Sequence, residues 1–347
     1  MSKIEESSLK KIFWMLFSLL LAAFTVWAIL RESKTLSISQ LFKVVIGGNP
    51  LYLAIAVICA AGYVFFEAVA ICSILKGINY KKKIHEGIIY STADVYFSAI
   101  TPSATGGQPA SAYFMHEDGI PTGVVSATLI LNLMMYTCAI GFLGIISIIM
   151  NPDFFREFGS VARIFICVGF VILIALTYFF YLLLKKSKSV FDFIRKVLTF
   201  LKSKNIFKVK DQVFSKLDKT QADYENCAKM FAGKSRILSK AFIFNVLQRA
   251  SQIAVPMFMY LCLGGNKSNM ITLFSKQSLV TIGYNFIPIP GAMGISDFLM
   301  IDGFSKIMTH EAAMQLDMVS RAISFYFCVT ISGLITLGGY LWKKKKR

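Results

Sequence analysis

Residues 100–109 read ITPSATGGQP, and residues 287–297 read IPIPGAMGISD. Each stretch combines prolines with two glycines and is flanked by apolar sequence. Proline removes a backbone donor and breaks a helix, whereas glycine tolerates positive φ, so both stretches predict interrupted helices. Short apolar segments that are interrupted in this way at corresponding places in two halves of a chain are typical of membrane transport sites.

The composition around these stretches predicts a membrane protein. Of the 347 residues, 56% are hydrophobic and 16% are charged, and the mean hydropathy is +0.62. Soluble domains are about 45–50% apolar and about 25% charged. Such a chain needs lipid as part of its solvent. Apolar runs long enough to cross a bilayer predict six spans, at residues 12–30, 51–75, 124–150, 161–184, 241–263 and 322–342.

The net charge of +18 is concentrated in blocks between the spans. Lysine-rich loops face the cytoplasm, which predicts a cytoplasmic location for four basic blocks: Lys3, Lys10 and Lys11; 81–83; 185–240; and 343–347. The weakly charged segments 151–163 and 264–269 should then lie outside. Both termini are expected on the cytoplasmic side of a bacterial plasma membrane.

This assignment leaves two segments that begin and end on the same side of the membrane. Residues 84–123 begin and end inside, and residues 270–320 begin and end outside. Both nevertheless contain stretches that are apolar enough to lie within a bilayer. We therefore expect an all-α polytopic membrane protein with six full transmembrane helices, two re-entrant helical hairpins of opposite orientation and pseudo-symmetric halves. The alternative is that both segments contain ordinary loops between additional full crossings.

Three regions follow from this division. Residues 1–184 form a first membrane half with the inner hairpin, and residues 241–347 form a second half with the outer hairpin. Between them, residues 185–240 alternate apolar and basic side chains. That pattern predicts amphipathic helices lying on the inner leaflet.

The hairpin tips are candidate anion sites, because a broken helix exposes N–H groups and a partial positive charge that bind phosphates or carboxylates. The candidate headgroup-binding residues at the tips are Thr105, Gly106, Gly107, Gln108, Pro290, Gly291, Gly294 and Asp297.

The predicted span 241–263 adds a polar face, because Asn245, Gln248, Arg249 and Gln252 have helical spacing. An arginine within a span is costly unless it faces a partner or a cavity. Three interpretations of Arg249 stay open: an ion pair with Glu67 or with an aspartate such as Asp94, a contact with a lipid phosphate, or snorkelling to the interface.

Other function classes find little support in the sequence. No basic patch is interleaved with stacking aromatics, so no nucleic-acid partner is expected. His85, His116 and His310 are not followed by a second ligand at helical spacing, and no metal site or cofactor is expected. No phosphate-binding loop for ATP is present. Transport would therefore be downhill or coupled to an ion gradient.

The two motifs, TPSATGGQPASAYFMHEDGIP at 101–121 and PIPGAMGISD at 288–297, resemble the flippase-like membrane domain of the lysylphosphatidylglycerol synthases, the multiple peptide resistance factors. The resemblance covers nearly the whole chain. It departs from the pattern of many relatives, which carry an acid and an arginine where this chain has Gln108 and Ser111, and a glutamate in place of Asp297. The chain ends at Arg347, directly after the last span, so we expect the C-terminal synthase domain to be absent.

The resemblance implies a lipid translocase, a flippase or scramblase that moves a phospholipid or an aminoacylated phospholipid between leaflets. Phosphatidylglycerol and lysylphosphatidylglycerol are the implied lipids. A first alternative is a lysyltransferase-type protein that acts in cationic peptide resistance with a separate synthase. A second is a membrane scaffold for a lipid-modifying enzyme. The sequence favours a non-enzymatic role, because the catalytic domain of the family is not seen, and it leaves a homo-oligomer open.

Overall fold

The computed structural model describes residues 47–345, apart from 102–103, 186, 204–212, 288–291, 293 and several positions between 216 and 232. Within these residues every regular element is a helix. The predicted first span at 12–30, the basic residues before it, and the tip residues Pro290 and Gly291 lie outside the described residues.

The first half of the described chain consists of two long helices with two short ones between them: α3 (Pro50–Gly77), α4 (Ile84–Ile100), α5 (Gly107–Glu117) and α6 (Thr122–Met150). Helix α3 begins where Asn49 caps it and Pro50 occupies its first turn. Helices α4 and α5 have 17 and 11 residues. At 1.5 Å per residue they are about 25 and 16 Å long, shorter than the roughly 30 Å hydrocarbon core of a bilayer.

The second half repeats this order. After α7 (Asp153–Arg156), α8 (Ser160–Lys185) and α9 (Ser187–Ser203) come the long α11 (Ser235–Cys262), the 3-10 turn η2 (Lys267–Asn269), and the short α12 (Met270–Tyr284) and α13 (Ile295–Phe304). The chain then forms one continuous helix through α14 (His310–Arg321), the π-helical segment η4 (Ala322–Phe327) and α15 (Cys328–Lys345).

Four described helices are long and apolar enough to cross a membrane: Pro50–Gly77, Thr122–Met150, Ser160–Leu183 and His310–Lys345. They contain the spans predicted at 51–75, 124–150 and 322–342, and all but the last residue of the span predicted at 161–184. The span predicted at 241–263 lies in the 28-residue helix α11. This helix is as long as α3, but it carries the polar face that includes Arg249.

Two helix boundaries differ from the prediction. The sequence predicts a helix that starts at Pro109, after the turn at residues 105–107, whereas α5 begins at Gly107. The last long helix begins at His310, because Thr309 caps it, and so its first turns take up the end of the segment predicted as the outer hairpin. The sequence placed this boundary later because the apolar run begins at residue 322. Asp317, however, is buried and lies 3.9 Å from Arg321, one turn further along.

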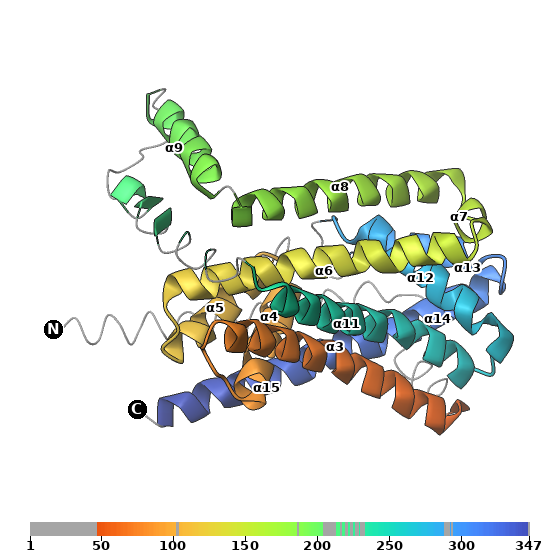
Figure 1. Ribbon diagram of the computed structural model, residues 1–347. Helices are drawn as coiled ribbons and strands as arrows, with labels where there is room; N and C mark the ends of the chain where they lie inside the picture. The colour runs from red at the N-terminus through yellow and green to blue at the C-terminus, as the bar shows by residue number, and fades with distance from the viewer. Residues whose placement is uncertain are drawn as a thin grey trace.

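The α4–α5 and α12–α13 hairpins lie at opposite ends of the bundle (Figure 1). Helices α3 and α11 run antiparallel between these ends, since Asn49 N–H donates to the carbonyl of Cys262 and Lys234 Nζ donates to the carbonyl of Gly77. The buried apolar residues accordingly form two clusters. One surrounds α4 and α5, and the other surrounds α12 and α13. The polar residues of α11 lie between them.

Helix α9 falls in the segment predicted to be amphipathic. Its Phe193 and Phe200 are exposed, at 66% and 57%. The same helix carries Arg195 and Lys196. In Figure 1 it projects away from the bundle beyond the end of α8.

A buried ion pair fixes the second hairpin to the loop before α8. Lys276 of α12 is fully buried, and its Nζ lies 2.5 Å from Glu157 Oε2 and 2.7 Å from the carbonyl oxygen of Gly303. Nearby, the Gly159 N–H donates to Asp302 Oδ2 at 2.8 Å. Glu157 is 38% exposed, whereas Lys276 is fully buried. Removing Glu157 and removing Lys276 should therefore cost the protein different amounts of stability.

We expect Glu157→Gln to destabilise the protein by about 3 kcal/mol, because it leaves a buried ammonium without a counter-charge. Lys276→Met should cost less, since the freed Glu157 carboxylate can be hydrated. Arg156→Ala is the control, because its pair with Asp153 is exposed at 74% and 63% and is worth at most about 1 kcal/mol. Thermal unfolding midpoints of the three variants in detergent would measure how strongly each one is destabilised. A larger loss for Lys276→Met would contradict this prediction.

Candidate functional site

The polar residues of α11 between the two apolar clusters, Asn245, Gln248, Arg249 and Gln252, form what we call the polar layer. Arg249 lies in this layer and is only 4% exposed. Its Nη1 donates to Gln252 Oε1 at 2.6 Å, and its Nη2 donates to the Tyr63 hydroxyl at 3.4 Å. The guanidinium lies 3.8 Å from the ring centroid of Tyr136 and 5.1 Å from that of Tyr63. Aromatic faces attract a cation, and more strongly where water is excluded.

Arg249 has no carboxylate partner at ion-pairing distance among the described residues, and its Nε has no hydrogen-bond partner there. Its burial also rules out snorkelling. Of the three interpretations left open by the sequence, a direct ion pair and a snorkelled side chain are therefore absent from this structure. The guanidinium is stacked on aromatic rings, and its Nε can still donate a hydrogen bond.

Two carboxyl groups, one buried and one half-buried, interact electrostatically with this arginine. Glu67 of α3 is 4% exposed and accepts a hydrogen bond from Ser91 Oγ at 2.8 Å. Asp94 of α4 accepts hydrogen bonds from Gln108 Nε2 at 2.9 Å and from Ser98 Oγ at 3.3 Å. Glu67 therefore belongs to a long helix, and Asp94 to the first helix of the hairpin.

The first hairpin tip is folded around Asp94. The Gly106 N–H donates to Thr101 Oγ1 at 2.8 Å, and Gly107 begins α5 against the Asp94 side chain. The first turn of α5, where an anion is favoured, thus faces a carboxylate of this chain. The backbone of Gly106 is right-handed, with φ −80°, so close approach and not positive φ requires a glycine there. Ala104 has φ 53°.

The remaining polar residues of α11 are buried and incompletely satisfied. Asn245 Nδ2 donates to Asn132 Oδ1 at 3.0 Å. Asn245 Oδ1 and Gln248 Oε1 have no partner among the described residues, although the two side chains are 0% and 1% exposed. Leaving such atoms unpaired costs free energy that a polar ligand would recover.

The second hairpin tip reaches the same layer through Tyr136, whose hydroxyl donates to Asn285 Oδ1 at 2.8 Å. Gly294, with φ 80°, caps α13, and its N–H donates to Asp297 Oδ2 at 3.0 Å. Asp297 is ion-paired with Arg321 of α14 and not with Arg249.

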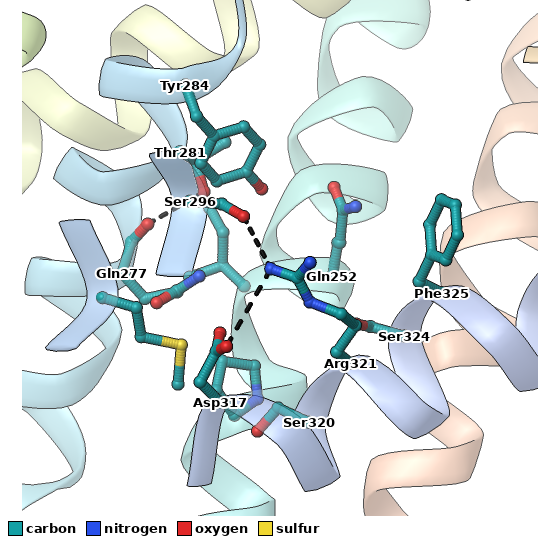
Figure 2. A pocket seen from close by; sticks show the side chains of 13 residues that line it. Gln252, Gln277, Thr281, Tyr284, Ser296, Asp317, Ser320, Arg321, Ser324 and Phe325 are labelled. Atoms are coloured by element: carbon teal, nitrogen blue, oxygen red, sulfur yellow. Dashed lines mark hydrogen bonds and ion pairs between the residues drawn. The ribbon is translucent and has the colours of Figure 1, made fainter. Parts of the chain in front are cut away.

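A cavity of about 120 Å³ surrounds Arg321. Figure 2 shows the Arg321 guanidinium between Ser296 and Asp317, with Gln252 on the opposite wall. The Ser320 hydroxyl, on the cavity wall, is 4% exposed and unpartnered among the described residues. Because Gln252 lines this cavity and also accepts from Arg249, it connects the two arginines.

The structure therefore divides the predicted site into two connected parts. Thr105, Gly106, Gly107 and Gln108 are near Asp94, whereas Gly294 and Asp297 are near Arg321. The sequence reasoning missed several residues that complete these parts: Tyr63, Asn132, Tyr136, Asn285, Asp317 and Arg321. Asn132 and Tyr136 are four residues apart inside an apolar run, as are Tyr63 and Glu67. That spacing was the available signal.

Long apolar helices, two short-helix hairpins and a charged layer between their tips define a polytopic helical membrane protein. The chain belongs to the family described as the lysylphosphatidylglycerol synthase TM region, whose model matches residues 15–332. It is also similar to a UPF0104 membrane protein of Archaeoglobus fulgidus, with 20% identity over 310 residues that cover 88% of this chain and 91% of that protein. The resemblance seen in the two motifs is thus confirmed.

Proposed function

We propose that this protein moves phospholipids between the leaflets of the membrane, with the lipid phosphate passing Arg249. One observation carries the proposal: Arg249 is almost fully buried, and no carboxylate among the described residues is paired with it. A buried guanidinium normally has an anionic partner. A phosphodiester supplies that charge and accepts hydrogen bonds from the planar guanidinium group.

The surroundings of Arg249 support this proposal. Gln248 Oε1 and Asn245 Oδ1 lie on the same face of α11 without partners among the described residues, and they can accept hydrogen bonds from headgroup hydroxyl or amino groups. The Arg321 cavity offers a second polar station on the far side of Gln252. Phosphatidylglycerol and lysylphosphatidylglycerol remain the lipids suggested by the family name.

Reconstitution tests the proposal against its alternatives. Liposomes containing the purified protein and a trace of acyl-labelled phosphatidylglycerol should exchange the label between leaflets faster than protein-free liposomes, as measured by quenching of the outer leaflet. A scaffold, or a partner of a separate synthase that moves no lipid itself, would give the protein-free rate. That rate would refute the proposal.

The proposal includes the full arrangement in the membrane: six spans, two re-entrant hairpins entering from opposite faces, and both termini in the cytoplasm of a bacterial cell. Opposite placement of the two hairpins in the bundle supports it (Figure 1). So does the length of α4, α5, α12 and α13, each too short to cross alone.

Cysteine labelling checks this arrangement. In a background without native cysteines, a cysteine at Lys82, Ser215 or Lys345 should resist an impermeant thiol reagent in intact cells, whereas one at Asn266 should react. The reason is the cytoplasmic location expected for lysine-rich loops. Labelling of the Lys82 position from outside would contradict the inner hairpin and the orientation together.

A further inference from the structure

The cavity around Arg321 has one more carboxylate than it needs to balance its arginine. The charged residues that line it in the described part of the chain are Asp317 and Arg321. Arg321 is ion-paired with Asp297, and its guanidinium lies 3.9 Å from Asp317. Because the arginine already has an anionic partner, we do not expect a further anion in this cavity. A cation, in contrast, would balance the second carboxylate.

Hydrogen-bond acceptors without a donor face the same cavity. Gln277 Oε1 and Ser320 Oγ are buried wall atoms that have no hydrogen-bond partner among the described residues. The whole Ser320 residue is only 4% exposed. The Asp317 carboxylate, at 3.9 Å, lies beyond hydrogen-bonding distance from Arg321. A primary ammonium group has three N–H donors and no acceptor, so it matches these three oxygen-bearing groups.

The apolar part of the wall distinguishes an alkylammonium group from a metal ion. Ile253 and Pro256 of α11, Met300 of α13 and Phe325 of η4 line the cavity together with the polar residues (Figure 2). A hard metal cation needs oxygen ligands on all sides. Methylene groups pack against an apolar wall, and an aromatic ring attracts an ammonium group. The cavity volume of about 120 Å³ exceeds the ~10–15 Å³ that one water molecule needs, so it has room for such a group.

Arg249 lies next to this cavity. Gln252 Oε1 accepts a hydrogen bond from Arg249 Nη1 at 2.6 Å, and Gln252 also lines the cavity. A phosphate at Arg249 is therefore one side chain away from the cavity, which calls for a short link between phosphate and ammonium. We propose that the Arg321 cavity binds the primary ammonium group of a zwitterionic phospholipid such as phosphatidylethanolamine, while the phosphate of that lipid contacts Arg249. This inference rests on the proposed function and names the lipid class.

Each charge of such a headgroup meets an opposite charge in the protein. The phosphate meets Arg249, and the ammonium meets Asp317, the carboxylate in excess at the cavity. Phosphatidylglycerol has the phosphate but no ammonium. It leaves the buried acceptors Gln277 Oε1 and Ser320 Oγ without a cationic donor. Since a hydrogen bond to a charged group is stronger than one between neutral groups, the protein should move phosphatidylethanolamine faster than phosphatidylglycerol.

The test compares headgroups in liposomes that contain the wild-type protein. Traces of acyl-labelled phosphatidylethanolamine, phosphatidylglycerol and phosphatidylcholine are followed separately by quenching of the outer leaflet. Phosphatidylethanolamine should cross about ten times faster than the other two. Phosphatidylcholine is the matched control, because its quaternary ammonium keeps the charge but has no N–H to donate. If either control lipid crosses as fast as phosphatidylethanolamine, this inference is overturned and the proposed function stands. Absence of flux for all three lipids would overturn both.

Variants assign the preference to this cavity. Asp317→Asn should reduce the ratio of the phosphatidylethanolamine rate to the phosphatidylglycerol rate to about one, because it removes the carboxylate in excess. Glu311→Gln is the matched control, since Glu311 is an exposed acid in the first turn of the same helix, and it should keep the wild-type ratio. If Asp317→Asn does not fold, Ser320→Ala takes its place and should lower the ratio about threefold. An unchanged ratio in the variant that folds would overturn the inference.

A soluble amine is the other source of an ammonium group. Free ethanolamine should leave the thermal unfolding midpoint of the wild-type protein in detergent unchanged, because without a phosphate at Arg249 it has only part of the contacts. A raised midpoint, together with equal rates for phosphatidylethanolamine and phosphatidylglycerol, would assign the cavity to a free amine and overturn the lipid headgroup.

Discussion

Replacing Gly107 with alanine should abolish phospholipid flux, the largest effect expected from a single added methyl group. A Cβ at this position would come within 2.6 Å of the backbone oxygen of Asp94 and closer still to the Asp94 and Ser98 side chains. Backbone cannot give way as a flexible side chain can, so α5 must move away from α4. Overpacking of this kind costs about 1–3 kcal/mol. More importantly, it moves Gln108 away from Asp94.

Gly141→Ala provides the control for this prediction. Gly141 lies within α6, and a Cβ there would meet no atom within 4 Å. Alanine is favoured over glycine in a helix by about 1 kcal/mol, so this variant should be as stable as the wild type or more so. Flux assays on both variants, with size-exclusion profiles to check folding, make the comparison. Normal flux in Gly107→Ala would mean that the first tip is a passive connector.

Gly106→Val extends the prediction to the neighbouring residue. A Cβ at Gly106 would approach the Thr101 side chain to 2.6 Å and the Phe97 carbonyl oxygen to 3.1 Å. We expect flux to fall here as well, but less than for Gly107→Ala, because a threonine side chain can rotate away. The ranking of the two variants distinguishes backbone contact from side-chain contact at the tip.

The helices of this protein could be predicted from the sequence better than its site could. Apolar runs of spanning length set α3, α6 and α8, because helix formation in lipid depends on length and hydropathy. Helix α14 was harder to place, since Asp317 reads as a loop residue until its neighbour Arg321 is seen one turn away. The i, i+4 spacing of the two residues was the available signal for a helix there.

Only part of the site could be predicted, because spacing shows which residues share a helix face but not what packs against that face. Spacing put Asn245, Gln248, Arg249 and Gln252 on one face, and the helix α11 keeps them there. What fills the space opposite that face depends on how α3, α6 and α11 pack. The spacing of Tyr136 from Asn132 marked a polar face, but an aromatic residue is common in any membrane span, so the sequence did not show that Tyr136 stacks on Arg249. Asp297 was predicted as a headgroup-binding residue of the second tip, and its ion pair with Arg321 was not predicted.

Arg249→Ala should reduce flux about a hundredfold, because losing charged hydrogen bonds worth about 3 kcal/mol at the barrier slows a step by roughly that factor. The variant should still fold. No carboxylate among the described residues is ion-paired with Arg249, so the substitution breaks no direct ion pair. The lost contacts with Tyr136 and Tyr63 should cost about 2 kcal/mol of stability.

Arg249→Lys and a second-site change make the prediction specific. Lysine keeps the charge but loses the planar fork and the stacking on Tyr136, so we expect about a tenfold loss of flux. Adding Glu67→Ala to Arg249→Ala should not increase expression over that of Arg249→Ala alone, because the two side chains are not ion-paired. Rescue would show that they are. Arg236→Ala, on an exposed turn of the same helix, is the matched control and should behave as the wild type. Wild-type flux in Arg249→Ala would remove the arginine from the lipid path.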